Sequence, residues 1–195
     1  MQCTSLGCEK KAVFHLAVIG NRRCFNEKHL CDEHARVELT SFSGTFPPFA
    51  GKRAAMERAR QFEIGAVIIS EINDQQVVYL HEVDGKRLFP LLIGIFEATS
   101  LHRRLRGDVS PRPLTHDAWA DTIRLFGAHL EAVAVQRLAN SVYFTTARIR
   151  HQGRLLDLDL RPSDAFILAL LFECPIFVAE EVLDQIDAGG NIKRF

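Results

Sequence analysis

Residues 154–172 read RLLDLDLRPSDAFILALLF and join a candidate strand to a strongly apolar candidate helix. Its first part, Leu155–Leu160, is expected to form a strand. The following segment, Ser163–Glu173, is apolar on nearly every side and is stopped by Pro175. We therefore expect an α+β fold in which this helix is the most buried element.

The same order of elements occurs twice along the chain. Strands are expected near residues 66–71, 77–81 and 87–93 before a helix over 95–105, and again near 132–137, 143–150 and 155–160 before the helix over 163–173. A shift of 67 residues without a gap aligns Glu97-Ala98 with Asp164-Ala165. The sequence predicts a duplicated core of three strands and a helix, with mixed or antiparallel sheets.

A further helix is marked between the two repeats. Thr115 is a suitable N-cap, Asp117 falls in the first turn, and Gly127 can end the helix. After the second repeat we expect a short strand at PIFV, residues 175–178, and a peripheral helix at EEVLDQI. This main domain is expected over residues 63–187, followed by a tail over 188–195.

The first 31 residues hold four of the five cysteines. An odd number of cysteines and no sign of export argue against a disulfide framework. Two pairs, Cys3-x4-Cys8 and Cys31-x2-His34, stand on either side of a segment long enough for a hairpin. This spacing predicts a structural zinc ion bound by Cys3, Cys8, Cys31 and His34. Cys24, His15 and His29 are also near and could replace one of these ligands.

We expect residues 1–39 to form a small zinc-binding β-hairpin module with almost no core, so that metal binding supplies much of its folding energy, with strands over 13–19 and 23–25. The segments CEKKAVFHL and LCDEHA resemble the zinc-binding N-terminal unit of the activator of bacterial protein-arginine kinase. The resemblance implies a structural or partner-contacting zinc. The present sequence departs from that unit in having four residues between the first two cysteines and a histidine as the fourth ligand.

The composition is that of an ordinary globular protein. The chain has 195 residues, 47% of them hydrophobic, and 24 basic against 24 acidic residues. No apolar stretch approaches the roughly 20 residues of a membrane helix, so we expect a cytoplasmic protein without membrane contact. Residues 40–62 are expected to form a linker, TSFSGTFPPFAG, and a short helix over 52–61.

Two segments carry polar residues at expected helix starts: RPLTHD at 112–117 and DLRPSD at 159–164. Helix N-termini favour the binding of phosphate, and an arginine side chain can donate bidentate hydrogen bonds to the phosphate oxygens. Carboxylates beside such a site could hold a divalent metal or act as general base, and His116 could act as acid or base. Helix capping is the alternative reading, since it alone would select Thr115, Asp117, Ser163 and Asp164.

Three motifs, PRPLTHDAW, DLRPSDAFILALLF and PIFVAEEVL, resemble the bifunctional nuclease domain family from about Ile64 to Gln185. The resemblance implies a duplicated α+β core, a homodimer, and activity on both DNA and RNA. It also implies a site that contains His116, Asp117, Arg161, Asp164 and Glu97.

We therefore expect a metal-assisted nuclease with Mg²⁺ or Mn²⁺ as the candidate catalytic ion. Asp164, Asp117 and Glu97 would be metal or base groups, and Arg161 and Arg112 would bind phosphate. A basic patch of Arg103, Arg104 and Arg106 would steer the nucleic acid. The alternative is a non-catalytic dimeric module that uses its zinc unit to bind a protein or nucleic-acid partner.

Overall fold

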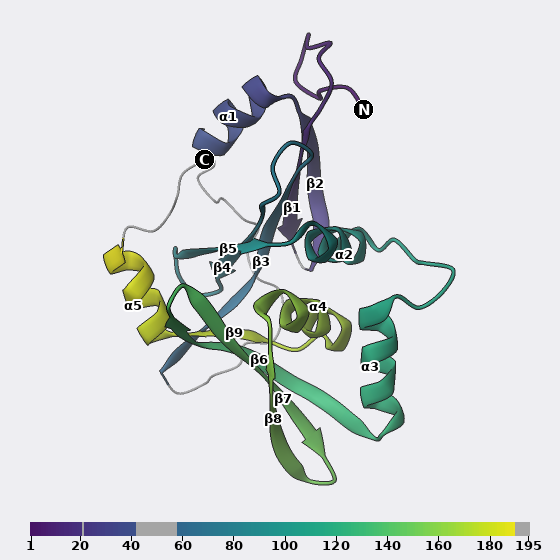
Figure 1. Cartoon of the computed structure of the whole chain (residues 1–195), viewed down its shortest axis with the longest axis vertical. Coiled ribbons are helices and arrows are strands. Elements are labelled where there is room, and N and C mark those ends of the chain that lie inside the picture. Colours follow the sequence, from purple (N-terminus) through teal and green to yellow (C-terminus); the bar gives the residue numbers. More distant parts are fainter. Residues whose placement is uncertain (21, 42–57, 190–195) are drawn as a thin grey trace. The chain divides into compact units, whose positions relative to one another are not determined.

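The structure is a computed structural model that describes residues 1–20, 22–41 and 58–189 (Figure 1). These residues form two compact units. The first contains residues 1–20, 22–41 and 64–107, and the second contains residues 58–63 and 108–189. Both units combine strands with helices, so the predicted α+β class is confirmed.

The sheet of the first unit is built on the N-terminal hairpin. Strands β1 (Phe14–Gly20) and β2 (Arg23–Leu30) pair antiparallel, and β1 also pairs antiparallel with β3 (Ala59–Ser70), from Phe14 opposite Ser70 to Val18 opposite Ala66. On the far side of β3 lies β4 (Gln76–Glu82), which pairs antiparallel with β5 (Leu88–Ile93). The expected hairpin is present, but it is an integral part of a larger sheet.

The hairpin shares its buried side chains with the strands beside it. Leu16 of β1 packs in one cluster with Ala66, Ile68 and Val77. A second cluster joins Cys3, Leu30 and Cys31 to Ala35 of helix α1 (Asp32–Ser41). The unit also contains helix α2 (Ile95–Arg106), which ends at Gly107 in the left-handed region, φ 75°. β1 therefore does not depend on a metal for all of its packing.

The second unit contains an antiparallel meander. β6 (Ala128–Ala139), β7 (Val142–His151) and β8 (Arg154–Leu160) follow one another, each paired with the next. β9 (Ile176–Ala179) pairs parallel with β6, and residues 59–61 of β3 pair antiparallel with β9. The result is the mixed sheet that the sequence predicts.

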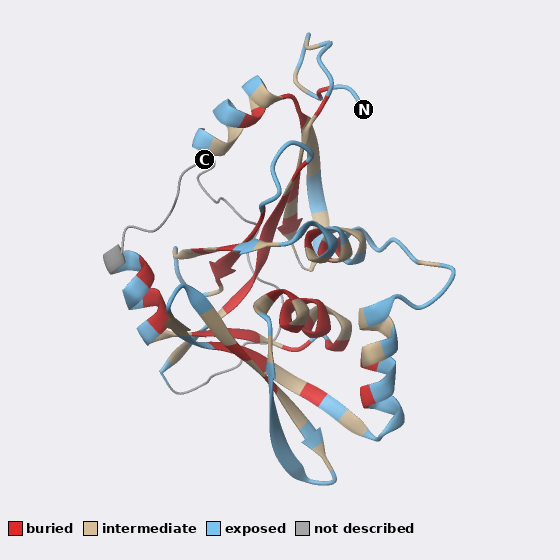
Figure 2. Ribbon diagram, in the orientation of Figure 1, coloured by how far each residue is buried: buried red, intermediate tan, exposed pale blue. Residues whose placement is uncertain are grey.

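Helix α4 (Pro162–Phe172) is the buried helix of this unit, as expected (Figure 2). Pro162 occupies its first position, where the missing N–H costs no hydrogen bond. Its buried residues are Ser163, Ala165, Phe166, Ile167, Leu168, Ala169 and Phe172. Two further helices, α3 (Thr115–Leu125) and α5 (Glu180–Gly189), complete the unit.

The duplicated order of elements is confirmed. β3, β4, β5 and α2 follow one another in the same order as β6, β7, β8 and α4. Helix α2 begins at Ile95 and helix α4 begins at Pro162, which is the expected shift of 67 residues.

Two local expectations are wrong. Residues 59–61 belong to β3 rather than to a helix over 52–61, because they pair with β9. The N-cap of α3 is Leu114 rather than Thr115, which is the first helical residue. The linker and tail fall largely on residues 42–57 and 190–195, outside the described residues, and the limits 1–39, 40–62 and 63–187 remain predictions. In the described part of the chain, no helix has the length and apolar character needed to cross a bilayer.

Candidate functional site

The first unit brings together four side chains that could hold a metal ion. The Sγ atoms of Cys3, Cys8 and Cys31 and a ring nitrogen of His34 all lie within 4.8 Å of one another. Cys3 Sγ is 3.4 Å and Cys31 Sγ is 3.2 Å from His34 Nδ1, and Cys8 Sγ is 3.9 Å from Cys31 Sγ. In residues 1–20, 22–41 and 58–189 this is the one group with metal-site geometry.

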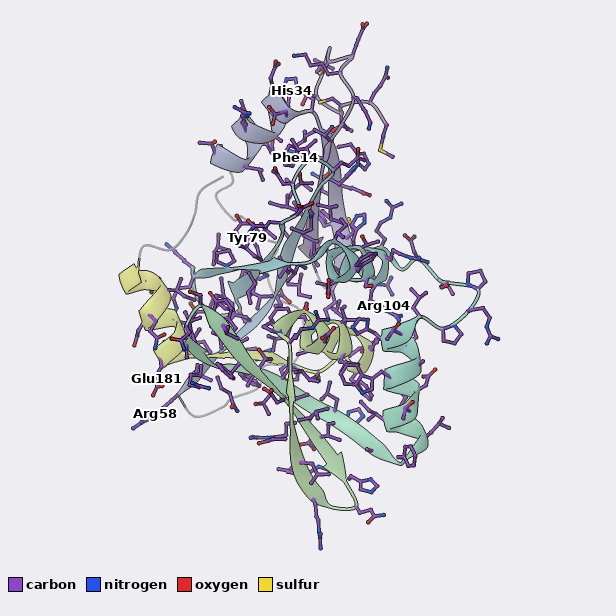
Figure 3. The ribbon with its side chains drawn as sticks, in the orientation of Figure 1. Phe14, His34, Arg58, Tyr79, Arg104 and Glu181 are labelled. Atoms are coloured by element: carbon purple, nitrogen blue, oxygen red, sulfur yellow. The ribbon has the colours of Figure 1, made fainter. Side chains whose placement is uncertain are left out.

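Local backbone structure explains why these ligands converge. The turn between Cys3 and Cys8 is closed by Cys8 N–H, which donates to Ser5 O at 3.1 Å, and it uses Gly7 at φ 75°. Thr4 N–H donates to His29 O at 2.7 Å, which fixes this turn against the end of β2. Cys31 directly precedes α1, and His34 lies in the first turns of that helix, as labelled in Figure 3.

The sulfur atoms influence one another's protonation. Burial raises the pKa of Cys3, but hydrogen bonds from the backbone of Cys31 and Ser5 and from the side chains of Ser5 and Cys8 outweigh it and bring the pKa to about 6. For Cys8, a backbone hydrogen bond from Lys10 lowers the pKa, but burial and the neighbouring sulfurs of Cys3 and Cys31 leave it raised. A thiolate is the form that binds metal, so the group is chemically suited to an ion.

The three alternative ligands lie outside this group. The thiol of Cys24 faces Asn26 O at 3.6 Å. His15 Nδ1 and His29 Nδ1 are 2.8 Å apart across the hairpin, and His15 Nε2 is 3.1 Å from Glu71 Oε1. Sequence reasoning missed this histidine pair, although the hairpin register that places His15 opposite His29 could have indicated it.

The second unit brings together three of the residues expected at the nuclease site. His116 Nε2 lies 2.9 Å from Asp164 Oδ1. Arg161 donates twice to the same carboxylate, from Nε to Oδ2 at 2.8 Å and from Nη2 to Oδ1 at 3.2 Å. Asp164 therefore joins the start of α3 to the start of α4.

The two helix starts position these side chains. At α3, the Asp117 carboxylate accepts the N–H of Leu114 at 3.0 Å and closes the first turn, which carries His116. At α4, Arg161 is the extended N-cap residue and Asp164 stands three residues later, so the arginine can fold back onto the carboxylate. Trp119, one turn beyond His116, has its ring centroid 6.4 Å from the imidazole.

The electrostatics favour an ionised Asp164. Its side chain is 14% exposed, and burial raises its pKa, but the hydrogen bonds from Arg161 and His116 outweigh burial and leave the pKa below its usual value. Because an ionised carboxylate only accepts hydrogen bonds, the proton lies on Nε2 of His116. In the neutral imidazole, Nδ1 is then the basic nitrogen.

That nitrogen is accessible. Among the described residues His116 makes one side-chain hydrogen bond, the bond from Nε2 to Asp164. Nδ1 is also not one of the buried side-chain atoms without a partner, so it reaches solvent. The His116 side chain is 16% exposed, and its second ring nitrogen makes no side-chain hydrogen bond within the described residues, so the orientated imidazole is suited to accept a proton from a bound molecule.

The remaining expected site residues are placed differently. Asp117 serves as a helix cap, and Arg112 is exposed. Glu97 and the basic patch lie on α2 in the first unit, where Arg106 donates to Glu27 at 2.6 Å. Arg104, which is labelled in Figure 3, lies in the last turn of that helix. Arginines in a last helical turn also complement the helix dipole.

Comparisons with known proteins place the chain in a family. Residues 78–189 match the profile of the bifunctional nuclease domain. Two relatives from Mycobacterium tuberculosis, named uncharacterized protein Rv1829 (strain H37Rv) and uncharacterized protein MT1877 (strain CDC 1551), are each 31% identical over 125 residues, or 64% of this chain and 74% of the relative. The profile match starts beyond the N-terminal cysteines, so the resemblance to the kinase activator stays a prediction. The chain belongs to the bifunctional nuclease domain family.

Proposed function

We propose that the protein is a nuclease that cleaves phosphodiester bonds of DNA and RNA. The observation that carries this proposal is the contact of His116 with Asp164, which leaves Nδ1 of the imidazole free to act as general base. Arg161, whose side chain is 68% exposed, adds a positive charge beside the carboxylate, where a phosphate oxygen could bind. The family supports the same reaction class.

In this proposal three residues of the second unit act together at the reacting phosphate. His116 accepts a proton from the attacking nucleophile and returns it to the leaving oxygen. Asp164 holds the imidazole in the tautomer with its proton on Nε2, and Arg161 fixes the carboxylate and attracts the phosphate. Arg112, Arg103, Arg104 and Arg106 are proposed to attract the nucleic-acid backbone.

A further part of the proposal concerns a Mg²⁺ or Mn²⁺ ion at this site. Asp164 is engaged by Arg161 and His116, and Asp117 by Leu114 N–H, so an ion bound here would have to replace those contacts. Hydrolysis measured across a series of divalent ions tests this part directly.

For the first unit we propose one structural zinc ion per chain. Three sulfur ligands and one imidazole form a donor set that zinc favours, and four protein ligands leave no open position for catalysis. The proposed zinc would fasten the segment Cys3–Cys8 to the start of α1 and have no part in the chemistry.

The alternative function, a non-catalytic dimeric interaction module, is supported by exposed apolar side chains. Leu156 and Leu158 of the outermost strand β8 share one face of that strand and are 50% and 39% exposed, which favours a second copy of the chain as a partner. In this alternative the zinc unit, where Leu6 is fully exposed, would bind a protein or nucleic-acid partner. This reading predicts binding without turnover, whichever divalent ion is added.

The deciding experiment measures cleavage of single-stranded DNA and RNA by the wild type, Asp164→Asn and Asp121→Asn. Asp121 is a matched control because it also pairs with an arginine three residues away, Arg124 at 3.1 Å, but on the exposed side of α3. We expect Asp164→Asn to lose about 10²–10⁴-fold of the rate, the usual contribution of general-base catalysis, and Asp121→Asn to retain it. Unchanged cleavage by a folded Asp164→Asn protein would exclude this assignment.

A further inference from the structure

The carboxylates beside His116 are engaged in protein contacts. Asp164 accepts hydrogen bonds from Arg161 and His116, and Asp117 accepts one from Leu114 N–H. Neither carboxylate takes part in a cluster of metal-ligand geometry within the described residues. The chemistry that these side chains supply by themselves is therefore proton transfer through imidazole, aided by a neighbouring guanidinium.

Proton transfer by a single imidazole suits the cleavage of RNA better than the cleavage of DNA. In RNA the nucleophile is part of the substrate, because the 2′-hydroxyl lies next to the phosphate that it attacks. A well-oriented intramolecular nucleophile can reach an effective concentration on the order of 10⁵ M or more, without any help from the site. DNA lacks this hydroxyl, so its cleavage requires a water molecule that the site must position and activate.

We infer that the His116–Asp164 site cleaves RNA by attack of the substrate's own 2′-hydroxyl, with DNA as a much slower substrate. This inference rests on the proposed nuclease function and names the preferred substrate of the same site. The 2′-hydroxyl is also the group by which a protein can distinguish RNA from DNA.

The reaction is balanced without any additional reagent. His116 Nδ1 takes the proton of the 2′-hydroxyl, the 2′-oxygen forms a bond to phosphorus, and the bond from phosphorus to the 5′-oxygen of the next nucleotide breaks. The imidazolium then gives its proton to that 5′-oxygen. The products are a 2′,3′-cyclic phosphate and a 5′-hydroxyl end. Asp164 stabilises the imidazolium between the two transfers, and Arg161 adds positive charge near the phosphate.

The test uses the full-length protein and three end-labelled single strands of one sequence: all RNA, all DNA, and DNA with a single ribonucleotide. Cleavage is followed in ¹⁸O-labelled water, and the new ends are identified by mass spectrometry. His116→Gln is compared with His129→Gln, since His129 is an exposed histidine of the same unit. The ring centroids of His129 and Phe172 are 5.5 Å apart in a T-shaped arrangement. Circular dichroism checks that each variant is folded.

We expect RNA to be cleaved at least about 100-fold faster than DNA, and the mixed strand to be cut only after its ribonucleotide. The new ends should be cyclic phosphates without solvent oxygen. His116→Gln should slow the reaction about 10²–10⁴-fold, and His129→Gln should not. If His116→Gln does not fold, the product ends formed by the wild type still distinguish attack by the 2′-hydroxyl from attack by water.

Two other results would separate the failure of this inference from the failure of the nuclease proposal. Cleavage of RNA and DNA at comparable rates, with solvent oxygen in the terminal phosphate, would overturn this inference and leave the nuclease proposal standing. Cleavage of none of the three strands would overturn both.

Discussion

Asp164 Oδ1 and His116 Nε2 are 2.9 Å apart although the two residues are separated by 48 positions in the chain. Each lies in the first turn of its helix, α4 and α3 respectively. The same carboxylate binds Arg161, so three side chains have their orientation fixed by one acidic group. Any substitution of Asp164 should therefore affect both the protonation of His116 and the local stability of the two helix starts.

The first prediction concerns stability at acidic pH. The pKa of Asp164 is lowered in the folded protein, whereas that of an unfolded aspartate is about 3.9. The ionised group thus stabilises the fold above about pH 4, and this contribution is lost as the pH falls through the folded-state pKa. The wild type should lose more of its free energy of unfolding below pH 4 than Asp164→Asn does, as measured by urea denaturation. Parallel plots of unfolding free energy against pH for the two proteins would contradict this prediction.

The second prediction tests whether the Asp117 side chain caps helix α3 or takes part in the cleavage reaction. Its carboxylate accepts the Leu114 N–H, so Asp117→Ala should cost about 0.5–2 kcal/mol of unfolding free energy. Asp117→Asn should cost less, since an amide oxygen can accept the same bond. Thermal denaturation of both variants checks this order. A large loss of nucleic-acid cleavage by a fully stable Asp117→Asn protein would instead assign the carboxylate a direct role in the reaction.

The third prediction concerns metal content. Metal analysis should find one zinc per chain, with metal–sulfur distances of about 2.3 Å and a metal–nitrogen distance of about 2.0–2.1 Å. Replacement of Cys31 by serine should abolish stoichiometric zinc binding, whereas replacement of Cys24, which faces Asn26, should not. Zinc-free protein after gentle purification would count against this site.

The fourth prediction concerns the effect of chelation. Hydrogen exchange should increase in residues 1–13 and in α1, which the proposed metal fastens, and should change little in β1. The reason is that Leu16 is packed against Ala66, Ile68 and Val77 whether or not an ion is bound. Loss of protection throughout β1 would show that the hairpin folds with the metal after all.

The fifth prediction concerns the core of the second unit. Phe166 of α4 is fully buried, so Phe166→Ala should cost about 3–5 kcal/mol. Leu125→Ala is the control, because Leu125 is 85% exposed at the end of α3 and its removal should change stability by no more than about 0.5 kcal/mol. Equal effects in denaturant titrations would mean that α4 is not the centre of this core.

Much of the fold follows from local signals. The apolar run after Asp164 predicts a buried helix because no face of it can be left in water, and the spacing of Cys3, Cys8, Cys31 and His34 predicts a metal site because the ligand types are so specific. The repeat shift of 67 residues correctly relates α2 to α4. These features depend on residues close in sequence or on a regular period.

The features that sequence reasoning missed depend on pairing between distant segments. Nothing in the hairpin sequence shows that β1 takes its place beside β3, since strand pairing depends on the whole sheet. Likewise Asp117 has the same chemistry as Asp164, and only geometry shows that one caps a helix whereas the other binds His116. The helix expected over 52–61 failed at residues 59–61, where pairing with β9 overrides a moderate helical tendency.

The place of β1 in the sheet also determines how the protein can be shortened. β1 covers the edge of β3 from Ala66 to Ser70, and β4 covers the other edge. A chain that starts after His34 would leave a row of unpaired N–H and C=O groups on an otherwise apolar strand, which is a template for intermolecular β-pairing. We expect such a protein to aggregate, so the N-terminal region would protect the edge of β3 from intermolecular pairing besides carrying the candidate metal ligands.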